Sequence, residues 1–275
     1  MTQNQKAKAD QLRELHADGV LVLPNAWDAG SAAVIARAGA KAIGTTSGGV
    51  AWSLGRTDNQ GLTRDEMVDQ VRRIAAAVDV PVTADIEGGY GESPEAVAQT
   101  VEAVVAAGAV GINLEDSRPD YSLYSIAEQT ARLRAARAAA ERAGLPELVI
   151  NVRTDVHLFG VGPAADRPAE VLARAEAFAE AGADSLFVPG LLDLAALAEL
   201  VKAQPLPVNV MAGPGSPSVA EFAGVGVRRV SLGTVVAQAA YSLAARATAQ
   251  LLADGSYGEL EDALDYGSIN GLFTD

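Results

Sequence analysis

The chain has 275 residues, and its 35 acidic and 21 basic residues give a formal net charge of −14 at pH 7. This charge disfavours nucleic acid and anionic membranes as partners, because both carry negative charge themselves. The absence of cysteine excludes disulfides, thiolate metal sites and a cysteine nucleophile. Residues 1–8 are polar, and no run approaches the roughly 20 apolar residues that cross a bilayer. We therefore expect a cytoplasmic protein without a secretory signal or a membrane span.

Short apolar runs alternate with helical patterns along the chain. Half of them follow an alanine-rich helix that stops at a glycine, the residue that best suits the left-handed end of a helix. In chain order, the eight expected strands lie at 20–24, within 36–44, at 80–86, within 106–114, at 148–153, within 180–188, at 206–211 and within 224–232. The expected helices between them cover 64–78, 94–107, 125–143, 168–181 and 192–203. Thr63-x-x-Glu66 and Ser93-Pro94-Glu95 are typical helix starts.

Eight strands that alternate with helices over about 250 residues indicate an α/β fold of the (β/α)8 TIM-barrel type. A doubly wound sheet is the alternative, but its Gly-x-Gly-x-x-Gly motif does not follow the first strand. No linker or charged block divides the chain, so we expect a single domain, 1–275. A long helix is expected over 237–254, with a short amphipathic segment after it. Because a barrel does not need residues 237–275, we expect this helical extension at a subunit interface.

Carboxylates gather at the ends of neighbouring strands, which is where barrels of this type carry their chemistry. Asp85 and Glu87 stand two residues apart and share one face of the third strand, and Glu115 ends the fourth. Three converging carboxylates repel one another unless a cation compensates them. A hard divalent ion with oxygen ligands does so, with Mg²⁺ as the first choice and Mn²⁺ as the alternative. The sequence therefore predicts a metal site formed by Asp85, Glu87 and Glu115.

Other polar or aromatic residues each allow two interpretations. Arg153 is either an ion pair for the acidic cluster or the anchor of a substrate carboxylate, and we favour the anchor because a guanidinium grips a carboxylate bidentately. Asp28 and Asp116 are typical of a helix cap or a salt-bridge partner. Trp27 is either the wall of a pocket or part of the packing. His16, in the first helix, is expected at the surface.

A series of short segments matches the landmarks of one family in order and on the expected strand ends. They include Asp85-Ile-Glu-Gly-Gly-Tyr-Gly91 and lie at 23–28, 46–49, 58, 84–91, 113–116, 150–155, 181–184, 187–190, 207–210 and 231–233. Through them, nearly the whole expected barrel resembles the isocitrate lyase/phosphoenolpyruvate mutase superfamily. The resemblance implies a barrel whose last helix is often exchanged between subunits, in a homodimer or homotetramer. It also implies Mg²⁺ and a small anionic 2-oxo acid or its enolate.

The resemblance assigns roles residue by residue. Asp85 matches the direct metal ligand, while Glu87 and Glu115 match acidic groups that reach the metal mostly through water. Ser47 and the backbone around Gly48 match the part of the site that holds the substrate carboxylate and oxo group. Arg153 matches the arginine of the substrate pocket, and Asp58 matches an active-site loop aspartate. We therefore expect substrate binding at Ser47, Gly48 and Arg153, with Trp27 and Gly49 beside them, and catalytic roles for Asp58 and Arg153.

Two departures from the family pattern are visible. The acidic pair is Asp-x-Glu where better-known members have Asp-x-Asp. The Lys-x-Cys-Gly-His loop of the isocitrate and methylisocitrate lyases is replaced by 116–125, which contains no Cys, Lys or His. An acid of the cysteine type is therefore excluded, and Tyr121 or Tyr124 becomes the candidate proton donor. The alternative is that these tyrosines pack over the mouth of the pocket.

We therefore expect a Mg²⁺-dependent lyase or hydrolase that cleaves a C–C bond in a small 2-oxo or 2-hydroxy dicarboxylate, of the oxaloacetate or substituted-malate type, through a metal-bound enolate. One alternative is P–C bond chemistry, as in phosphoenolpyruvate mutase or phosphonopyruvate hydrolase. An alternative of another class is a non-catalytic barrel that binds a 2-oxo acid.

Overall fold

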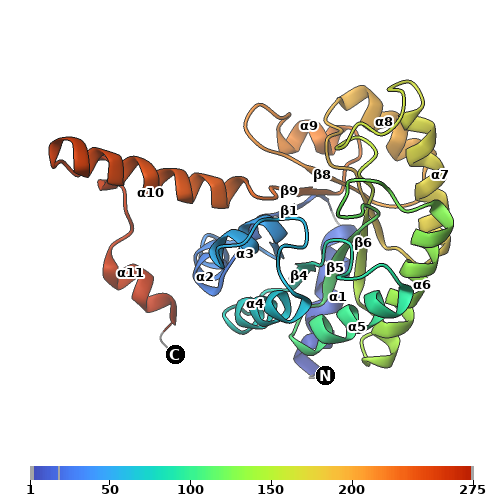
Figure 1. Cartoon of the computed structure of the whole chain (residues 1–275), viewed down its shortest axis with the longest axis horizontal. Coiled ribbons are helices and arrows are strands. Elements are labelled where there is room, and N and C mark those ends of the chain that lie inside the picture. Colours follow the sequence, from blue (N-terminus) through green and yellow to red (C-terminus); the bar gives the residue numbers. More distant parts are fainter. Residues whose placement is uncertain (1–2, 18, 274–275) are drawn as a thin grey trace.

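A computed structural model describes residues 3–17 and 19–273 and shows nine parallel strands wound into a nearly closed barrel, with helices around it (Figure 1). The strands are β1 Leu21–Leu23, β2 Asn25–Ala26, β3 Ile43–Thr45, β4 Val82–Asp85, β5 Gly111–Glu115, β6 Val149–Arg153, β7 Ser185–Phe187, β8 Val208–Met211 and β9 Arg229–Ser231. Their order in the sheet is β1-β9-β8-β7-β6-β5-β4-β3-β2. The predicted barrel class is thereby confirmed, and each expected strand is present.

The first expected strand is divided in two at Pro24. Proline has no N–H to donate to a ladder, so β1 pairs with β9 while β2 pairs with β3. The side chain of Asn25 bridges the two sides of this break. Its Nδ2 donates to the Thr45 carbonyl at 2.9 Å, and its Oδ1 accepts from the amides of Leu232 and Gly233, both at 2.9 Å. One amide side chain thus joins the beginning of the barrel to its end.

The helices agree with the expected ones to within about two residues at most ends. Around the barrel they are α1 Gln3–Ala17, α2 Ala29–Arg37, α3 Ser47–Ser53, α4 Arg64–Ala76, α5 Pro94–Ala106, α6 Ile126–Arg142, α7 Arg167–Glu180, α8 Leu194–Ala203 and α9 Val219–Gly224. Thr63 and Glu66 form the expected reciprocal capping box at the start of α4, and Ser93 caps α5. Asp28 caps α2, as one of its two interpretations predicted.

Alternation along the strands separates an apolar shell from a polar lumen. On β5, Ile112 and Leu114 are fully buried in the apolar core between strands and helices, and Asn113 and Glu115 take the opposite face. In the lumen, Asn113 Oδ1 accepts from Asn151 Nδ2 at 2.9 Å and from a terminal guanidinium nitrogen of Arg229 at 3.0 Å. This hydrogen-bonded layer forms the floor beneath the charged residues at the strand ends.

The long expected helix is α10 Val235–Asp254, followed by η1 Gly258–Leu260, α11 Tyr266–Asn270 and η2 Gly271–Phe273. It runs away from the barrel, to the left of the view in Figure 1. Near its base, Tyr241 meets Trp52 of α3 edge to face, with ring centroids 6.4 Å apart. Large apolar side chains further along are exposed, including Leu252 at 81% and Tyr266 at 84%. Among the described residues, no helix is long and apolar enough to cross a bilayer.

His16 lies in α1 as expected, but its predicted exposure is wrong, because only 8% of it is exposed. The ring packs toward the barrel floor, and Nδ1 lies 2.7 Å from the Leu12 carbonyl. Nε2 is buried and has no hydrogen-bond partner among the described residues. Burial, together with the nearby charge of Arg229, lowers the pKa of His16 to about 4.

This burial predicts a pH-dependent stability. The pKa of His16 is lower in the folded state than its ordinary value of 6.5, so the stability it contributes is complete above pH 6.5 and is lost as the pH falls toward 4. The loss amounts to about 3 kcal/mol at most. Urea unfolding of the wild type and His16→Gln at pH 7 and pH 4.5 measures it. The wild type should lose more free energy of unfolding than the variant; equal losses would contradict the assignment.

Candidate active site

A cavity of about 370 Å³ opens at the carboxyl ends of the central strands. Its lining residues are Ser47, Thr57, Asp58, Asn59, Glu87, Glu115, Tyr121, Arg153, Leu158 and Phe159. Six of the sequence-predicted site residues therefore meet in one place, from loops and strand ends far apart in the chain. Asp85 is buried directly behind the lining, against Ser47 and Glu87.

Asp85 ends β4 and contacts the first turn of α3. Its Oδ2 accepts from the Ser47 amide at 3.2 Å, and its own amide donates to Thr45 Oγ1 at 2.8 Å. Burial raises the pKa of Asp85, while the Arg153 guanidinium and the Ser47 amide act in the opposite direction. The carboxylate is thus fixed in orientation but poorly solvated.

Glu87 stands just beyond the strand in a left-handed backbone conformation, with φ of 47°. Tyr90 donates its hydroxyl to Glu87 Oε1 at 2.8 Å, and the Gln60 amide donates to Oε2. Burial and then the neighbouring charge of Asp85 raise the pKa of Glu87 to about 7. The other non-glycine residues with positive φ, at Asn59, Gln60, Tyr90 and Tyr121, lie in the loops of the same site. Strained backbone concentrated in this way is typical of functional sites.

Glu115 and Arg153 form a buried ion pair across neighbouring strands. Glu115 Oε2 lies 2.9 Å from one terminal nitrogen of Arg153, and Nε of Arg153 donates to Asp155 Oδ1 at 2.7 Å. Burial raises the pKa of Glu115 to about 8 despite Arg153, and Asp155 adds to the rise. Burial alone would lower the pKa of Arg153, but the charges of Glu115, Asp155 and Asp85 raise it. Among the described residues, the second terminal nitrogen of Arg153 makes no hydrogen bond.

Asp155 was not among the predicted site residues, although it follows Arg153 by two positions and so shares its face of the chain. Ser117 Oγ lies 2.7 Å from Asp155 Oδ2 and 2.9 Å from Glu115 Oε1, which ties the ends of β5 and β6 together. Asp116 points away from the cavity and pairs with Arg174 at 2.9 Å, as its salt-bridge interpretation predicted.

The residues that could hold a divalent ion do not form a closed cage. Within residues 3–17 and 19–273, no three His, Asp or Glu side chains already enclose a metal position. Glu87 is turned toward Tyr90, and Glu115 toward Arg153. This arrangement fits an ion that keeps most of its water and takes one or two carboxylates directly, which is the habit of Mg²⁺. The four buried carboxyl groups of Asp85, Glu87, Glu115 and Asp155 also outnumber the two nearby guanidinium groups of Arg153 and Arg229, so a cation could compensate the remaining negative charge.

The start of α3 brings the backbone close to the cavity. A Cβ at Gly48 would lie 2.9 Å from Asp58 Oδ2, and a Cβ at Gly49 would lie 2.9 Å from Trp27 Cβ. Both positions therefore exclude larger residues. Trp27 packs behind Gly49 and is not among the residues that line the cavity, whereas Asp58 and Ser47 are.

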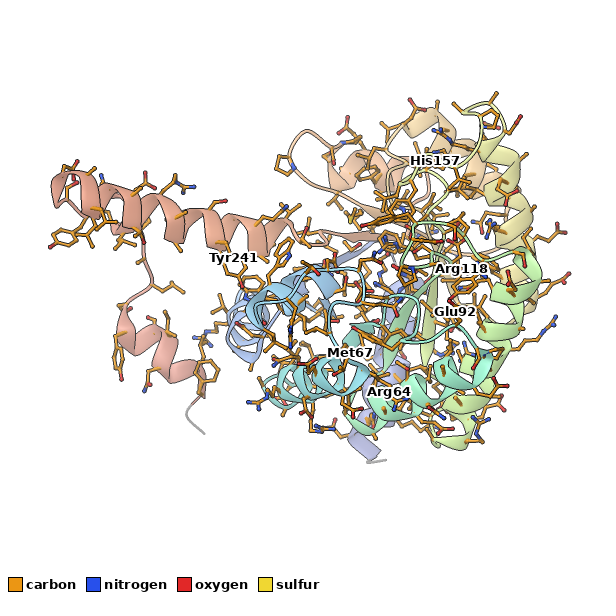
Figure 2. The ribbon with its side chains drawn as sticks, viewed as in Figure 1. Arg64, Met67, Glu92, Arg118, His157 and Tyr241 are labelled. Atoms are coloured by element: carbon orange, nitrogen blue, oxygen red, sulfur yellow. The ribbon has the colours of Figure 1, made fainter. Side chains whose placement is uncertain are left out.

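The two candidate tyrosines occupy different environments. Tyr121 lines the cavity and is 57% exposed. Tyr124 is buried between the guanidinium groups of Arg118 and Arg132, each 4.0 Å from the ring centroid. Arg118 and Glu92, from the loops beside this ring, are labelled in Figure 2. Of the two tyrosines, Tyr121 is therefore the one that reaches the cavity.

Arg132 of α6 is a site-supporting residue that the sequence did not reveal. It is buried and donates to the carbonyls of Gly88, Gly91 and Glu92, at 2.9 Å for Gly91 and 2.6 Å for Glu92. One turn earlier on the same helix, Gln129 donates to the Glu115 carbonyl at 3.1 Å. Helix α6 thus fixes the backbone at the end of β5, which carries Glu115, and the loop after β4, which follows Glu87. The only signal in the sequence is a pair of long polar residues three positions apart in an alanine-rich helix.

Comparison with known proteins places the chain in a family. The sequence model of the phosphoenolpyruvate phosphomutase family matches residues 12–252. The chain belongs to the isocitrate lyase/phosphoenolpyruvate mutase superfamily. The resemblance carried by the motifs is confirmed, and it covers most of the barrel.

Three known proteins illustrate the similarity. An uncharacterized protein of Mycobacterium tuberculosis is 36% identical over 263 residues, 95% of each chain. The 2-methylisocitrate lyase of Escherichia coli is 34% identical over 191 residues, which cover 66% of this chain and 61% of that enzyme. The structure of oxaloacetate acetylhydrolase in complex with the product oxalate matches with a TM-score of 0.86 at 27% identity, covering 97% of this chain and 94% of that one. Membership of the superfamily supports an enzyme of the carbon–carbon lyase type.

The contacts of Arg132 predict a large loss of stability on its removal. Arg132→Leu removes the donor from the buried Gly88 carbonyl and from the partly buried carbonyls of Gly91 and Glu92, so the free energy of unfolding should fall by about 3 kcal/mol. Arg134→Leu is the matched control, because Arg134 is exposed on the same helix. Urea unfolding of both variants measures the difference, and similar losses in the two would contradict the role given to Arg132.

Proposed function

We propose that the chain is a Mg²⁺-dependent lyase or hydrolase that cleaves a C–C bond in a small 2-oxo or 2-hydroxy dicarboxylate of the oxaloacetate or substituted-malate type. The observation that carries this proposal is the meeting of Asp85, Glu87, Glu115 and Arg153 at one cavity at the barrel mouth. The similarity to 2-methylisocitrate lyase supports C–C bond cleavage, and the similarity to oxaloacetate acetylhydrolase supports a dicarboxylate as the substrate.

The residues that would hold the metal are Asp85 directly and Glu87 and Glu115 through water, with Mn²⁺ as an alternative to Mg²⁺. A bound divalent ion polarises a 2-oxo group and stabilises the negative charge that develops on its oxygen when the neighbouring C–C bond breaks. Glu87 and Glu115 must lose their protons to bind a cation, because burial, followed by neighbouring carboxylates, raises the pKa of both groups.

The chain's own groups position the substrate. Ser47 lines the cavity, and Gly48 beside it packs closely against Asp58 of the same lining, so we assign the substrate carboxylate and oxo group to this segment. Arg153, held by Glu115 and Asp155, keeps one terminal nitrogen for a second carboxylate. The Tyr121 hydroxyl is the candidate for delivering a proton to the departing fragment, and Asp58, another polar residue of the lining, is a second catalytic candidate. These roles rest on position, and each is part of the proposal.

Binding of oxalate, a mimic of the pyruvate enolate, tests the metal site. Calorimetric titration of the wild type should show oxalate binding only with Mg²⁺ present. Asp85→Ala should weaken that binding by about 100-fold or more, because it removes the direct ligand. Asp79→Ala, at an exposed position outside the site, is the control. Unchanged affinity in a folded Asp85→Ala protein would overturn the assignment.

P–C bond chemistry is the second candidate, favoured by the match to the phosphoenolpyruvate phosphomutase family. Phosphorus NMR with phosphonopyruvate distinguishes it from C–C cleavage. Binding of oxalate without turnover of either class would leave the third alternative, a barrel that binds a 2-oxo acid.

We also propose a homodimer or homotetramer built through residues 235–273. Strand β1 neighbours β9, from which α10 leads away, and Val22 on β1 is 46% exposed. A second cavity of about 480 Å³ lies at this place, lined by apolar residues of α1, β1 and α2. A helix of a second copy would cover it and would bury the exposed apolar residues of the extension.

Light scattering tests the assembly. The wild type should be dimeric or tetrameric, and Leu252→Glu should shift it toward the monomer by placing a charge in the interface. Leu54→Glu, an exposed leucine outside the extension, is the control and should leave the mass unchanged. A monomeric wild type would refute the proposal.

A further inference from the structure

The cavity has two chemically different sides. One side carries Glu87, Glu115 and Arg153 at the strand ends, and another carries the side chains of Tyr121, Leu158 and Phe159 from two loops. The polar residues Ser47, Thr57, Asp58 and Asn59 complete the lining. Tyr121 and Phe159 meet edge to face, with ring centroids 5.1 Å apart. They come from the loops after β5 and β6, so two separate loops build one continuous apolar wall.

Both loops are fixed in place by backbone hydrogen bonds. The Phe159 amide donates to the Asp155 carbonyl at 3.0 Å, which ties the wall to a residue that also holds Arg153. The Tyr121 amide donates to the Arg118 carbonyl at 2.9 Å, in a turn where Tyr121 has a φ of 65°. The wall is therefore formed before any ligand enters, and its distance from the charged side is set by the strands.

The positive charge available to a substrate is limited. Arg153 is the one cation among the residues that line the cavity, and two of its nitrogens already serve Glu115 and Asp155. Arg118, on the loop beside Tyr121, pairs with Glu128 at 2.9 Å. Arg167, beyond Phe159, donates to the carbonyls of Gly160 and Gly162. The site can therefore accept one anionic group of a substrate at the proposed metal ion and one at Arg153.

A third anionic group would have to lie against the wall of Tyr121, Leu158 and Phe159. There it would find no second cation among the described lining residues, and apolar surface would replace part of its water, which is unfavourable. Burial of an alkyl group in the same position is favourable, because it removes apolar surface from water. Each buried carbon should improve affinity by roughly fourfold.

We propose that this wall receives the C3 substituent of the substrate and selects an alkyl group there, so that the preferred substrates are 3-alkylated dicarboxylates. This inference rests on the proposed function, since it assumes that the 2-oxo or 2-hydroxy end lies at Asp85 and the second carboxylate at Arg153. Molecules with a third carboxylate on the C3 side chain are excluded by charge and not by size.

Two malates of equal shape test the charge argument. The 3-isobutyl and 3-carboxymethyl derivatives have the same number of non-hydrogen atoms and differ in the charge of the substituent. In competition with oxalate at saturating Mg²⁺, 3-methylmalate should bind several-fold more tightly than malate. The isobutyl derivative should bind at least about tenfold more tightly than the carboxymethyl derivative.

Variants of the wall separate this inference from the proposed function. Phe159→Ala should lower the affinity ratio of 3-isobutylmalate to malate several-fold. Oxalate affinity should stay unchanged, because oxalate has no C3 carbon. Phe159→Arg should favour the carboxymethyl derivative instead. Val161→Ala, in the same loop but outside the cavity lining, is the control and should keep the wild-type preference. Circular dichroism confirms that each variant is folded.

The outcomes are distinct. Failure of wild-type protein to bind oxalate with Mg²⁺ would refute the proposed function. Oxalate binding together with equal affinity for malate and its alkyl derivatives, or with a preference for the carboxymethyl derivative, would refute the apolar wall as a selector and leave the proposed function standing.

Discussion

The site depends on an imbalance of buried charge. Asp85, Glu87, Glu115 and Asp155 lie close together out of water. Among the described residues, Arg153 is the guanidinium that forms ion pairs with them, and the buried Arg229 adds a second positive charge near Asp85. Repulsion among carboxylates in a medium of low polarity is far stronger than in water, so such a cluster persists only where rigid surroundings hold it. The strained backbone at Glu87 is part of that restraint, and a divalent cation would relieve the repulsion that the restraint resists. The backbone strain that holds the carboxylates together would therefore also favour the binding of a metal ion.

The barrel supplies the restraint through hydrogen bonds that cross between elements. The amides of Asn113 and Asn151 join β5 to β6 beneath the charged layer, and Ser117 joins the same strands above it. From outside the strands, Gln129 and Arg132 hold the backbone of both acidic strand ends. The charged side chains therefore lie between the asparagine layer in the lumen and helix α6 outside the strands. Neither the asparagine layer nor α6 can shift without breaking several hydrogen bonds.

Much of this arrangement could be predicted from the sequence, and what could not has a physical reason. Parallel strands of period two place Asp85 and Glu115 at one end of the barrel whatever the details of packing, so the cluster followed from spacing alone. The split at Pro24, the burial of His16 and the contacts of Arg132 depend on which distant segment lies opposite, and local patterns do not contain that information. Tyr121 and Tyr124 stand three residues apart in a loop, where no periodicity decides which ring faces the cavity.

The bridge made by Asn25 has a consequence for the order of assembly. The two amides that it binds lie 207 and 208 residues further along the chain. During synthesis, Asn25 therefore leaves the ribosome long before Leu232 and Gly233 have been made. Until then, its side-chain oxygen can only bind water or other groups. The ring of strands can close through Asn25 only after β9 has been synthesised, so this junction stays open while all the strands between β1 and β9 are made.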